Sequence, residues 1–293
     1  MTVIVVGAGI AGLACARELI DAGVPARVLE RGRVVGGRLA SKRFDDRYVD
    51  IGAAYLTADD PGFRGRLESW RIAGLAHPWT DTFAVCGAAV TTETNGPVRW
   101  AAPGGLRSLA EDLALELDVT LEHEVTDLPH AEAVVLAMPG PQAQRITPLD
   151  IRQEWSPVLT AVLTYPVRDW RDFHGMFVND HPVLASVCDD GDRRGDRASV
   201  LVAHSTAGFA RPRLDDPAAA ADELEAAVRD LLALPRADAV RVHRWTFAQP
   251  EPVDGRFYRQ GDVYLAGDAF GKPRVQTAWL SGRAVAHAIL RSR

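Results

Sequence analysis

A short apolar strand, a glycine-rich turn and a helix open the chain and limit its fold more than any other feature. Thr2–Val6 is an apolar, β-branched run typical of a buried parallel strand. Gly7-Ala8-Gly9-Ile10-Ala11-Gly12 follows directly, and a helical pattern then continues from Ile10 to Asp21. Pro25–Glu30 reads as a second strand. This order predicts a strand–turn–helix–strand unit of the kind that binds a dinucleotide.

Each residue type in the turn has a physical role. Gly7 allows the tight turn, Gly9 lets a pyrophosphate approach the backbone, and Gly12 lets the helix pack close to the strand. The helix N-terminus supplies amide donors and the positive end of a dipole. Glu30 is placed to accept hydrogen bonds from an adenosine ribose, and its charge argues against a 2′-phosphate, and so against NADP. The alternative is a glycine-rich turn that binds no ligand.

Two further glycine-rich segments extend the pattern. Gly36-Gly37-Arg38 precedes a hairpin-like stretch with Asp45-Asp46 at its turn, which leads into Asp50–Tyr55. Near the other end, the apolar run Val263–Ala266 precedes Gly267-Asp268, and a helical pattern follows from about Gln276 to Ser292. An NAD domain needs neither segment. A longer dinucleotide with a ribityl chain needs both, because further backbone must approach it, so the sequence predicts FAD.

The individual residues of these segments also have plainer interpretations. Arg38 is predicted to pair with the pyrophosphate, and the alternative is a surface arginine. Gly267-Asp268 alone is an ordinary strand-end turn. Val125, on a strand-like segment before the buried strand Ala133–Pro139, could offer backbone contacts to an adenine, although a simple core strand is as good an interpretation.

Composition excludes several classes of protein. The net charge is −6 over 293 residues, and no basic block indicates nucleic-acid binding. No stretch reaches the length of a membrane span. Cys15, Cys86 and Cys188 have no metal or disulfide spacing, so we expect free thiols in a cytoplasmic protein without a metal site. No cysteine lies in the C-terminal segment, so FAD is expected to be bound non-covalently.

The fold class predicted is α/β, with a Rossmann-like FAD-binding domain interleaved with an α+β substrate domain on a mixed, largely antiparallel sheet. We assign residues 1–60, 100–150 and 258–293 to the FAD-binding domain. Residues 61–99 and 151–257 are assigned to the substrate domain, where strands are expected at 161–167, 199–204 and 240–246 and a helix at 217–234.

Several motifs together resemble a known family. VVGAGIAGLACARELIDAG is typical of the flavin amine oxidase superfamily as a whole. GGRLASKR, AAYLTADD and HRWTFAQP, with LAGDAFGKPRVQTAWLSGRAVAHAIL, narrow the resemblance to its renalase-like group, and especially to bacterial members. The resemblance covers most of the chain.

The resemblance implies an FAD-dependent oxidase. The substrates implied are isomeric dihydronicotinamide dinucleotides, the 2- and 6-dihydro forms of NAD(P), which give a hydride to flavin N5. Molecular oxygen then reoxidises the flavin and forms hydrogen peroxide. His204 and His243 are implied to face the substrate cavity, and Tyr55 could cap the flavin ring. The alternatives are a flavin amine oxidase acting on a small amine, and a non-catalytic FAD-binding protein.

The chain departs from the family pattern at three places. Ala54 replaces a glutamine beside the flavin, the stretch from Val125 to Ala133 is too short for the usual β-meander, and Cys188–Arg197 lacks an expected Asn and Lys-Pro. These departures affect the expected substrate more than the cofactor. The candidate cofactor-binding residues are Gly7, Gly9, Ala11, Gly12, Glu30, Arg31, Gly37, Arg38, Ala54, Tyr55, Val125, Gly267, Asp268, Val275, Thr277 and Ala278.

Overall fold

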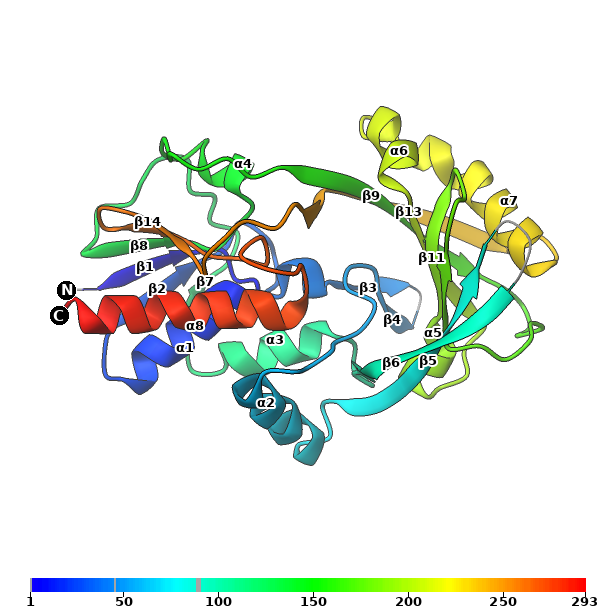
Figure 1. The fold of residues 1–293 in the computed structure, drawn as a ribbon, viewed down its shortest axis with the longest axis horizontal. Coiled ribbons are helices and arrows are strands. Elements are labelled where there is room, and N and C mark those ends of the chain that lie inside the picture. The colour runs from blue at the N-terminus through cyan, green and yellow to red at the C-terminus, as the bar shows by residue number, and fades with distance from the viewer. Residues whose placement is uncertain (1, 45, 88–90) are drawn as a thin grey trace.

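Two sheets, each with its own helices, make up the molecule (Figure 1). The computed structural model describes residues 2–44, 46–87 and 91–293. The first sheet contains β1 (Val3–Val6), β2 (Ala26–Leu29), β7 (Asp118–Thr120), β8 (Ala133–Leu136), β14 (Tyr258–Gln260) and β15 (Val263–Leu265). The second contains β5 (His77–Cys86), β6 (Thr91–Ala101), β9 (Trp155–Thr164), β10 (Gly175–Val178), β11 (Leu184–Asp189), β12 (Val200–Ser205) and β13 (Ala239–Pro250).

A hairpin and the helices complete the architecture. The hairpin consists of β3 (Ser41–Phe44) and β4 (Arg47–Asp50). The α-helices are α1 (Ile10–Asp21), α2 (Pro61–Ile72), α3 (Arg107–Ala114), α4 (Gly140–Ala143), α5 (Asp190–Arg194), α6 (Ala207–Ala210), α7 (Ala221–Leu232) and α8 (Val275–Arg291). Short 3-10 turns lie at Gly37–Leu39, Arg211–Arg213 and Pro217–Ala220.

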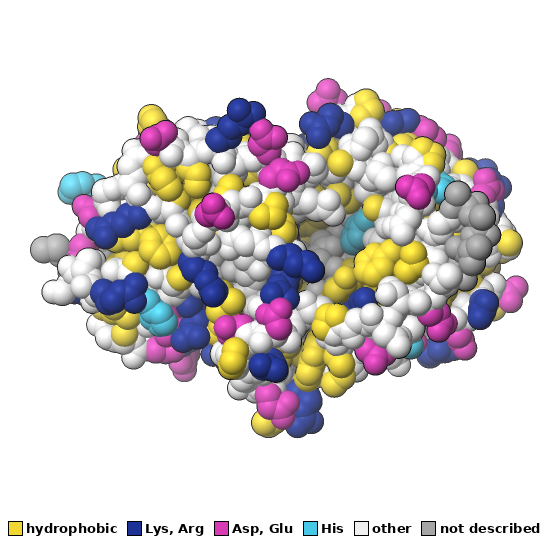
Figure 2. All heavy atoms as spheres, viewed as in Figure 1, with side chains coloured by type: hydrophobic (Ala, Val, Ile, Leu, Met, Phe, Trp, Pro, Cys, Tyr) yellow, Lys and Arg dark blue, Asp and Glu magenta, His cyan; other side chains and the backbone are white. Residues whose placement is uncertain are grey.

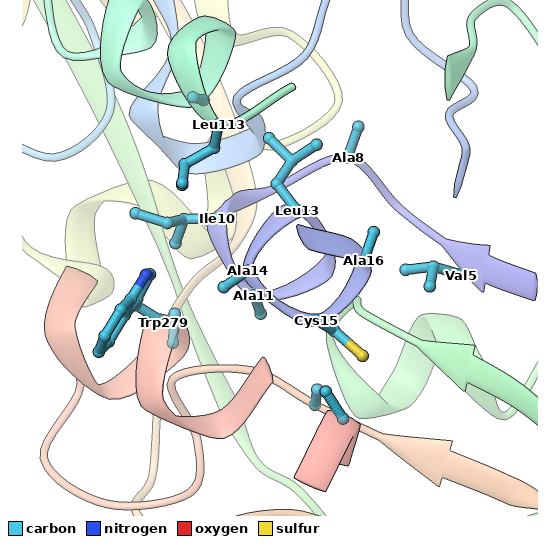
Figure 3. Close-up of a cluster of buried hydrophobic side chains, with 14 of the residues drawn as sticks. Val5, Ala8, Ile10, Ala11, Leu13, Ala14, Cys15, Ala16, Leu113 and Trp279 are labelled. Atoms are coloured by element: carbon cyan, nitrogen blue, oxygen red, sulfur yellow. The ribbon is translucent and has the colours of Figure 1, made fainter. Parts of the chain in front are cut away.

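The first sheet runs in the order β14-β15-β8-β1-β2-β7 and is parallel except for the β14–β15 pair. The two long helices α1 and α8 lie side by side over one face of it (Figure 1). Small residues allow this close packing, because a Cβ on Gly282 of α8 would overlap the Ala11 carbonyl of α1. Figure 3 shows the buried side chains of this core, where Trp279 of α8 lies beside Ala11 and Ala14 of α1.

The second sheet runs in the order β13-β9-β12-β11-β10-β5-β6 and is antiparallel except for the β5–β10 pair. Successive side chains along each strand point to opposite faces of this sheet, so every second residue lies on the same face. Leu159, Ala161 and Leu163 of β9 pack with α7 in one apolar cluster. Val162 of β9 packs against Ile51, just after the hairpin, in another. This second face of the sheet is therefore turned toward the nucleotide-type unit.

The predicted fold class is confirmed: an α/β unit with a parallel sheet is interleaved with a largely antiparallel one. The helix predicted from Ile10 to Asp21 has these bounds, and the hairpin after Arg38 is present. The strand expected at 161–167 is β9, which ends at Thr164. It begins earlier because Trp155 and Ser156 pair with the long strand β13.

Two placements differ from expectation. Val125 was expected on a strand, but the strand of this region is β7, and Val125 lies in the connection after it. Val125 is half-buried on the edge of an apolar cluster, between exposed neighbours, and is not paired in a sheet. Helix α2 packs its Phe63 and Trp70 into the same core as α1 and α8. We therefore propose that the first unit extends through α2, beyond residue 60.

In the part of the chain that the structure describes, every helix is too short or too polar to cross a membrane. All three cysteines are free thiols, as predicted, and Cys15 and Cys188 are buried.

Candidate functional site

The glycine-rich turn lies between β1 and α1 as the sequence predicts. Gly7 has a φ of 107°, and a Cβ there would lie 2.6 Å from the Ala137 carbonyl oxygen, so only glycine fits. A Cβ on Gly12 would overlap the Gly7 carbonyl oxygen. A Cβ on Gly9, by contrast, would meet no atom within 4 Å. The three glycines thus divide into two that serve packing and one that leaves open space.

Among the described residues, no side chain caps the N-terminus of α1. Gly9 is its N-cap, and its first turn holds no acidic residue. Its first amides therefore have no side-chain acceptor, and the helix dipole places positive charge beside the open space at Gly9.

Glu30 is held at the end of β2, against the turn. Its carboxylate accepts hydrogen bonds from the amides of Ala8, at 2.8 Å, and Gly32, at 2.7 Å. Both bonds fix the Glu30 carboxylate beside the turn. Arg31, the next candidate, is exposed.

The second glycine segment meets the first directly. Gly36 donates its amide to the Ala8 carbonyl at 2.8 Å, and Gly9 and Gly36 form an isolated parallel bridge. A Cβ on Gly37 would lie 3.3 Å from the Gly9 Cα. Backbone of both segments therefore borders the same open space.

The third segment joins through an ion pair. Arg38 makes a bidentate contact with Asp268, with 2.7 Å between Nη1 and Oδ2, and it also donates to the Ala248 carbonyl at 3.1 Å. Its guanidinium lies 4.9 Å from the centre of the Trp155 ring. Arg38 was expected to pair with a pyrophosphate, whereas here it binds the Asp268 carboxylate. Arg38 thus ties the second segment to the third and to the second sheet.

The remaining C-terminal candidates follow this turn. Val275 begins α8, Ala278 is buried in the core, and Thr277 donates to the Lys272 carbonyl at 2.6 Å. In the described part of the chain, no side chain caps the N-terminus of α8. A cleft of about 460 Å³ opens here, and its lining includes Asp60 and Thr277.

A row of polar residues crosses the face of the second sheet that is turned toward the first unit. Ser186 of β11 pairs with His204 of β12, and Thr160 of β9 pairs with both His204 and His243 of β13. Directly paired residues share one face of a sheet. Thr160 donates to the Ile51 carbonyl at 2.9 Å, which fixes the row under the turn that begins at Ile51.

Both histidines are held neutral. Burial lowers the pKa of His204 to about 4, with a further contribution from the Arg193 cation, against hydrogen bonds to the backbone of Ile51 and Gly52. Burial and the nearby Lys42 lower the pKa of His243 to about 4. His243 contacts Lys42 Nζ at 3.0 Å through Nδ1. Both histidines thus lie on the face of the second sheet that is turned toward the first unit, and His243 contacts the hairpin.

An ion cluster lies beneath the turn from Asp50 to Tyr55. Arg193 of α5 is 1% exposed, is paired with Asp190, and donates to the Ala54 carbonyl at 2.8 Å. Asp50 accepts from Ser41 and from the Leu106 amide, and burial raises its pKa. Sequence reasoning missed this cluster, because a charged run such as 189–197 is expected at the surface. Ala54, the departure from the family pattern, is held through its backbone.

Aromatic rings surround the next residue, Tyr55. Its ring lies 5.4 Å from that of Phe83 in an edge-to-face arrangement, and Phe83 in turn contacts Trp79 and Phe177. The guanidinium of Arg99, a residue that sequence reasoning missed, lies among these rings. Figure 2 shows the surface hollowed between the two units, with a histidine side chain on the wall of the hollow.

Comparison with known proteins agrees with this geometry. The family described as NAD(P)-binding Rossmann-like domain matches residues 5–78. The chain is 47% identical to putrescine oxidase from Kocuria rosea over 57 residues, which are 20% of this chain and 12% of that protein. It is 49% identical to flavin-containing amine oxidase B from Cavia porcellus over 55 residues, 18% of this chain and 11% of that one.

Over its whole length, the chain is similar to solved oxidase structures. Cyclohexylamine oxidase from Brevibacterium oxydans superposes with a TM-score of 0.79 over 99% of each chain, at 15% sequence identity. The chain therefore has the fold of cyclohexylamine oxidase, and its residues 5–78 are similar to the NAD(P)-binding Rossmann-like domain.

Proposed function

We propose that the protein is an FAD-dependent oxidase that takes a hydride from isomeric dihydronicotinamide dinucleotides, the 2- or 6-dihydro forms. The observation that supports the cofactor is that three glycine-rich segments distant in sequence are linked to one another in the fold. Gly36 is bonded to the first segment, and Arg38 is paired with Asp268 of the third. The expected occupant is a ligand long enough to touch all three, as FAD is.

The chain's own residues would bind the parts of this ligand. The uncapped N-terminus of α1, with the open space at Gly9, would take the pyrophosphate. Glu30 would bind the ribose of adenosine. Arg38 and Asp268 would lie at the sugar-alcohol chain, and the N-terminus of α8 would face the ring beyond it. Non-covalent binding is part of the proposal.

Once bound, FAD supplies the redox chemistry, accepting a hydride and transferring the electrons to molecular oxygen, with hydrogen peroxide as the product. The protein has to orient the donor and exclude water. A hydride donor needs no base to deprotonate it. The depressed pKa values of His204 and His243, both about 4, fit this requirement, because neutral rings can donate hydrogen bonds without adding charge.

A second candidate function is the oxidation of a small amine. It is favoured by the likeness to putrescine oxidase and cyclohexylamine oxidase, and by the aromatic rings of Tyr55, Phe83 and Trp79. Aromatic faces can bind an amine near a flavin.

Anaerobic mixing of the yellow holoprotein with each candidate donor separates these functions. The panel holds the 2- and 6-dihydro isomers, ordinary NADH, and small mono- and diamines, and flavin absorbance is followed with time. We expect fast bleaching by the isomers, slow bleaching by NADH, and peroxide when oxygen is admitted. Bleaching by an amine alone would establish the second function, and bleaching by no donor would indicate a non-catalytic FAD-binding protein.

A further inference from the structure

Arg193 of α5 is bonded to the backbone of the turn from Asp50 to Tyr55. Its side chain is 1% exposed and pairs with Asp190. Its guanidinium also donates to two carbonyl oxygens of the turn, that of Ala54 at 2.8 Å and that of Asp50 at 3.4 Å. A guanidinium is a planar fork of fixed donors, so partners bonded to it are held in one geometry. Arg193 therefore fixes the turn against the second unit, the one built on the second sheet.

The Ile51 carbonyl of the same turn is also held by side chains of the second unit. It accepts from Thr160 Oγ1 of β9 and from Trp245 Nε1 of β13, each at 2.9 Å. In a trans peptide, the C=O of one residue and the N–H of the next point in opposite directions. Each carbonyl that is drawn toward the second unit therefore turns the following amide away from it.

The amide of Ile51 shows this arrangement. It follows the Asp50 carbonyl and donates to the Ala40 carbonyl of the first unit at 3.0 Å. The amides of Gly52 and Tyr55 are turned in the same way by the carbonyls before them, but neither has a hydrogen-bond acceptor among the residues that the structure describes. Both residues are half-buried. Since a half-buried amide needs an acceptor, these two can serve a ligand.

The turn lies directly on the second glycine-rich segment. Ala53 donates its amide to the Arg38 carbonyl at 2.9 Å, and a Cβ on Gly52 would overlap that same oxygen. The Arg38 side chain is in turn paired with Asp268 of the third segment. The amides of Gly52 and Tyr55 therefore lie next to the residues proposed to hold the cofactor.

We propose that Arg193 is a positioning residue for the cofactor, which holds the Ala54 carbonyl and thereby aims the Tyr55 amide at an acceptor atom of the flavin ring. Thr160 acts on the Gly52 amide in the same way. Fixed donors stabilise the electron-rich reduced ring more than the oxidised ring, so they raise the reduction potential of the bound flavin. The inference rests on the proposed function through its cofactor alone.

The test measures the reduction potential of the holoprotein with a chemical reductant and a reference dye, so it needs no substrate. Arg193→Lys keeps the charge, but a single ammonium lacks the fork that bonds Asp190 and Ala54 together. We expect the preference for reduced over oxidised FAD to fall about 10-fold, which lowers the potential of a two-electron couple by about 30 mV. Thr160→Val changes no charge and should shift the potential in the same direction, so it keeps the test valid if Arg193→Lys fails to fold.

Each variant has a matched control. Arg168 also pairs with a buried aspartate, Asp189, at 2.6 Å, but within the described residues its hydrogen bonds go to side chains outside the turn. Thr164 lies on the same strand as Thr160, and its hydroxyl donates to the Ala239 carbonyl of the second sheet at 3.4 Å. Arg168→Lys and Thr164→Val should leave the potential unchanged, whatever they cost in stability.

The outcomes separate the positioning role from the proposed reaction. An unchanged potential in Arg193→Lys and Thr160→Val, or an equal fall in the two controls, would overturn the inference. If the potentials respond as expected but no donor bleaches the native flavin, the positioning role is supported and the proposed reaction is refuted. A native protein that binds no FAD would refute both.

Discussion

Adding a single methyl group at Gly9 tests the cofactor site without disturbing the fold. Gly9 has φ −75° and ψ 173°, which alanine adopts freely, and an added Cβ would meet no atom within 4 Å. Gly9→Ala should therefore leave the free energy of unfolding of the cofactor-free protein nearly unchanged. The methyl would, however, stand where the pyrophosphate must approach the backbone. We expect FAD affinity to fall about 10- to 100-fold, or about 1.4 to 2.8 kcal/mol.

Gly12→Ala is the contrasting variant. Its Cβ would overlap the Gly7 carbonyl oxygen and lie 3.0 Å from the Ala137 Cβ, so the turn itself would have to move. The cofactor-free protein should lose about 1 to 3 kcal/mol of stability. Gly65→Ala, at an exposed position of α2 where an added Cβ would meet no described atom within 4 Å, controls for an added methyl elsewhere.

Two measurements separate the variants. Urea unfolding of the cofactor-free protein gives stability, and FAD fluorescence quenching gives affinity. The expected pattern is weak FAD binding with normal stability for Gly9→Ala, and reduced stability for Gly12→Ala. If Gly9→Ala binds FAD as tightly as the native protein, the pyrophosphate does not lie at this turn.

Three other variants test separate parts of the account. Gly282→Ala should lower the melting temperature, since its Cβ would overlap the Ala11 carbonyl and force α8 away from α1; an unchanged melting curve would show that this helix contact is loose. Asp268→Asn should weaken the bidentate pair with partly exposed Arg38, which should cost about 1 to 3 kcal/mol of stability and weaken FAD binding. Urea unfolding and FAD fluorescence quenching measure the two effects. No change in either would exclude a role for the pair. The pKa of His204 is lowered in the folded state, so protonation favours unfolding, and the free energy of unfolding should fall as pH drops from about 6.5 toward about 4. His204→Gln should flatten this pH dependence, which is measured as the urea midpoint against pH. An unchanged slope would assign the pH dependence to other groups.

The nucleotide-type unit was largely predictable from sequence because its signals are local. Within the first 30 residues, the strand, the turn with its fixed glycine spacing and the helix follow one another directly, so each supports the assignment of its neighbour. The same reasoning anticipated that Gly36 and Gly267 would serve one ligand, and Gly36 does lie against Ala8. It could not predict that Arg38 binds Asp268, since that contact depends on how two distant turns meet.

The rest of the chain was less predictable, and Val125, in the connection between β7 and β8 of the first sheet, shows one reason. A short β-branched run is compatible with both a strand and a partly buried connection, and only tertiary pairing decides between them. Arg99 and Arg193 show another. Charged residues are expected at the surface, so nothing in the sequence marks an arginine that aromatic rings or an aspartate stabilise in the interior. Such residues become visible only when the sheet brings their partners together.

The stoichiometry of a single anaerobic turnover tests the central proposal most directly. Holoprotein is mixed with one equivalent of 6-dihydro-NAD per flavin, and both the flavin spectrum and the nicotinamide product are measured. The account predicts that each flavin reduced is matched by one oxidised NAD, and that admitted oxygen restores the yellow flavin with one hydrogen peroxide. Flavin that stays oxidised, or is reduced without formation of oxidised NAD, would contradict it.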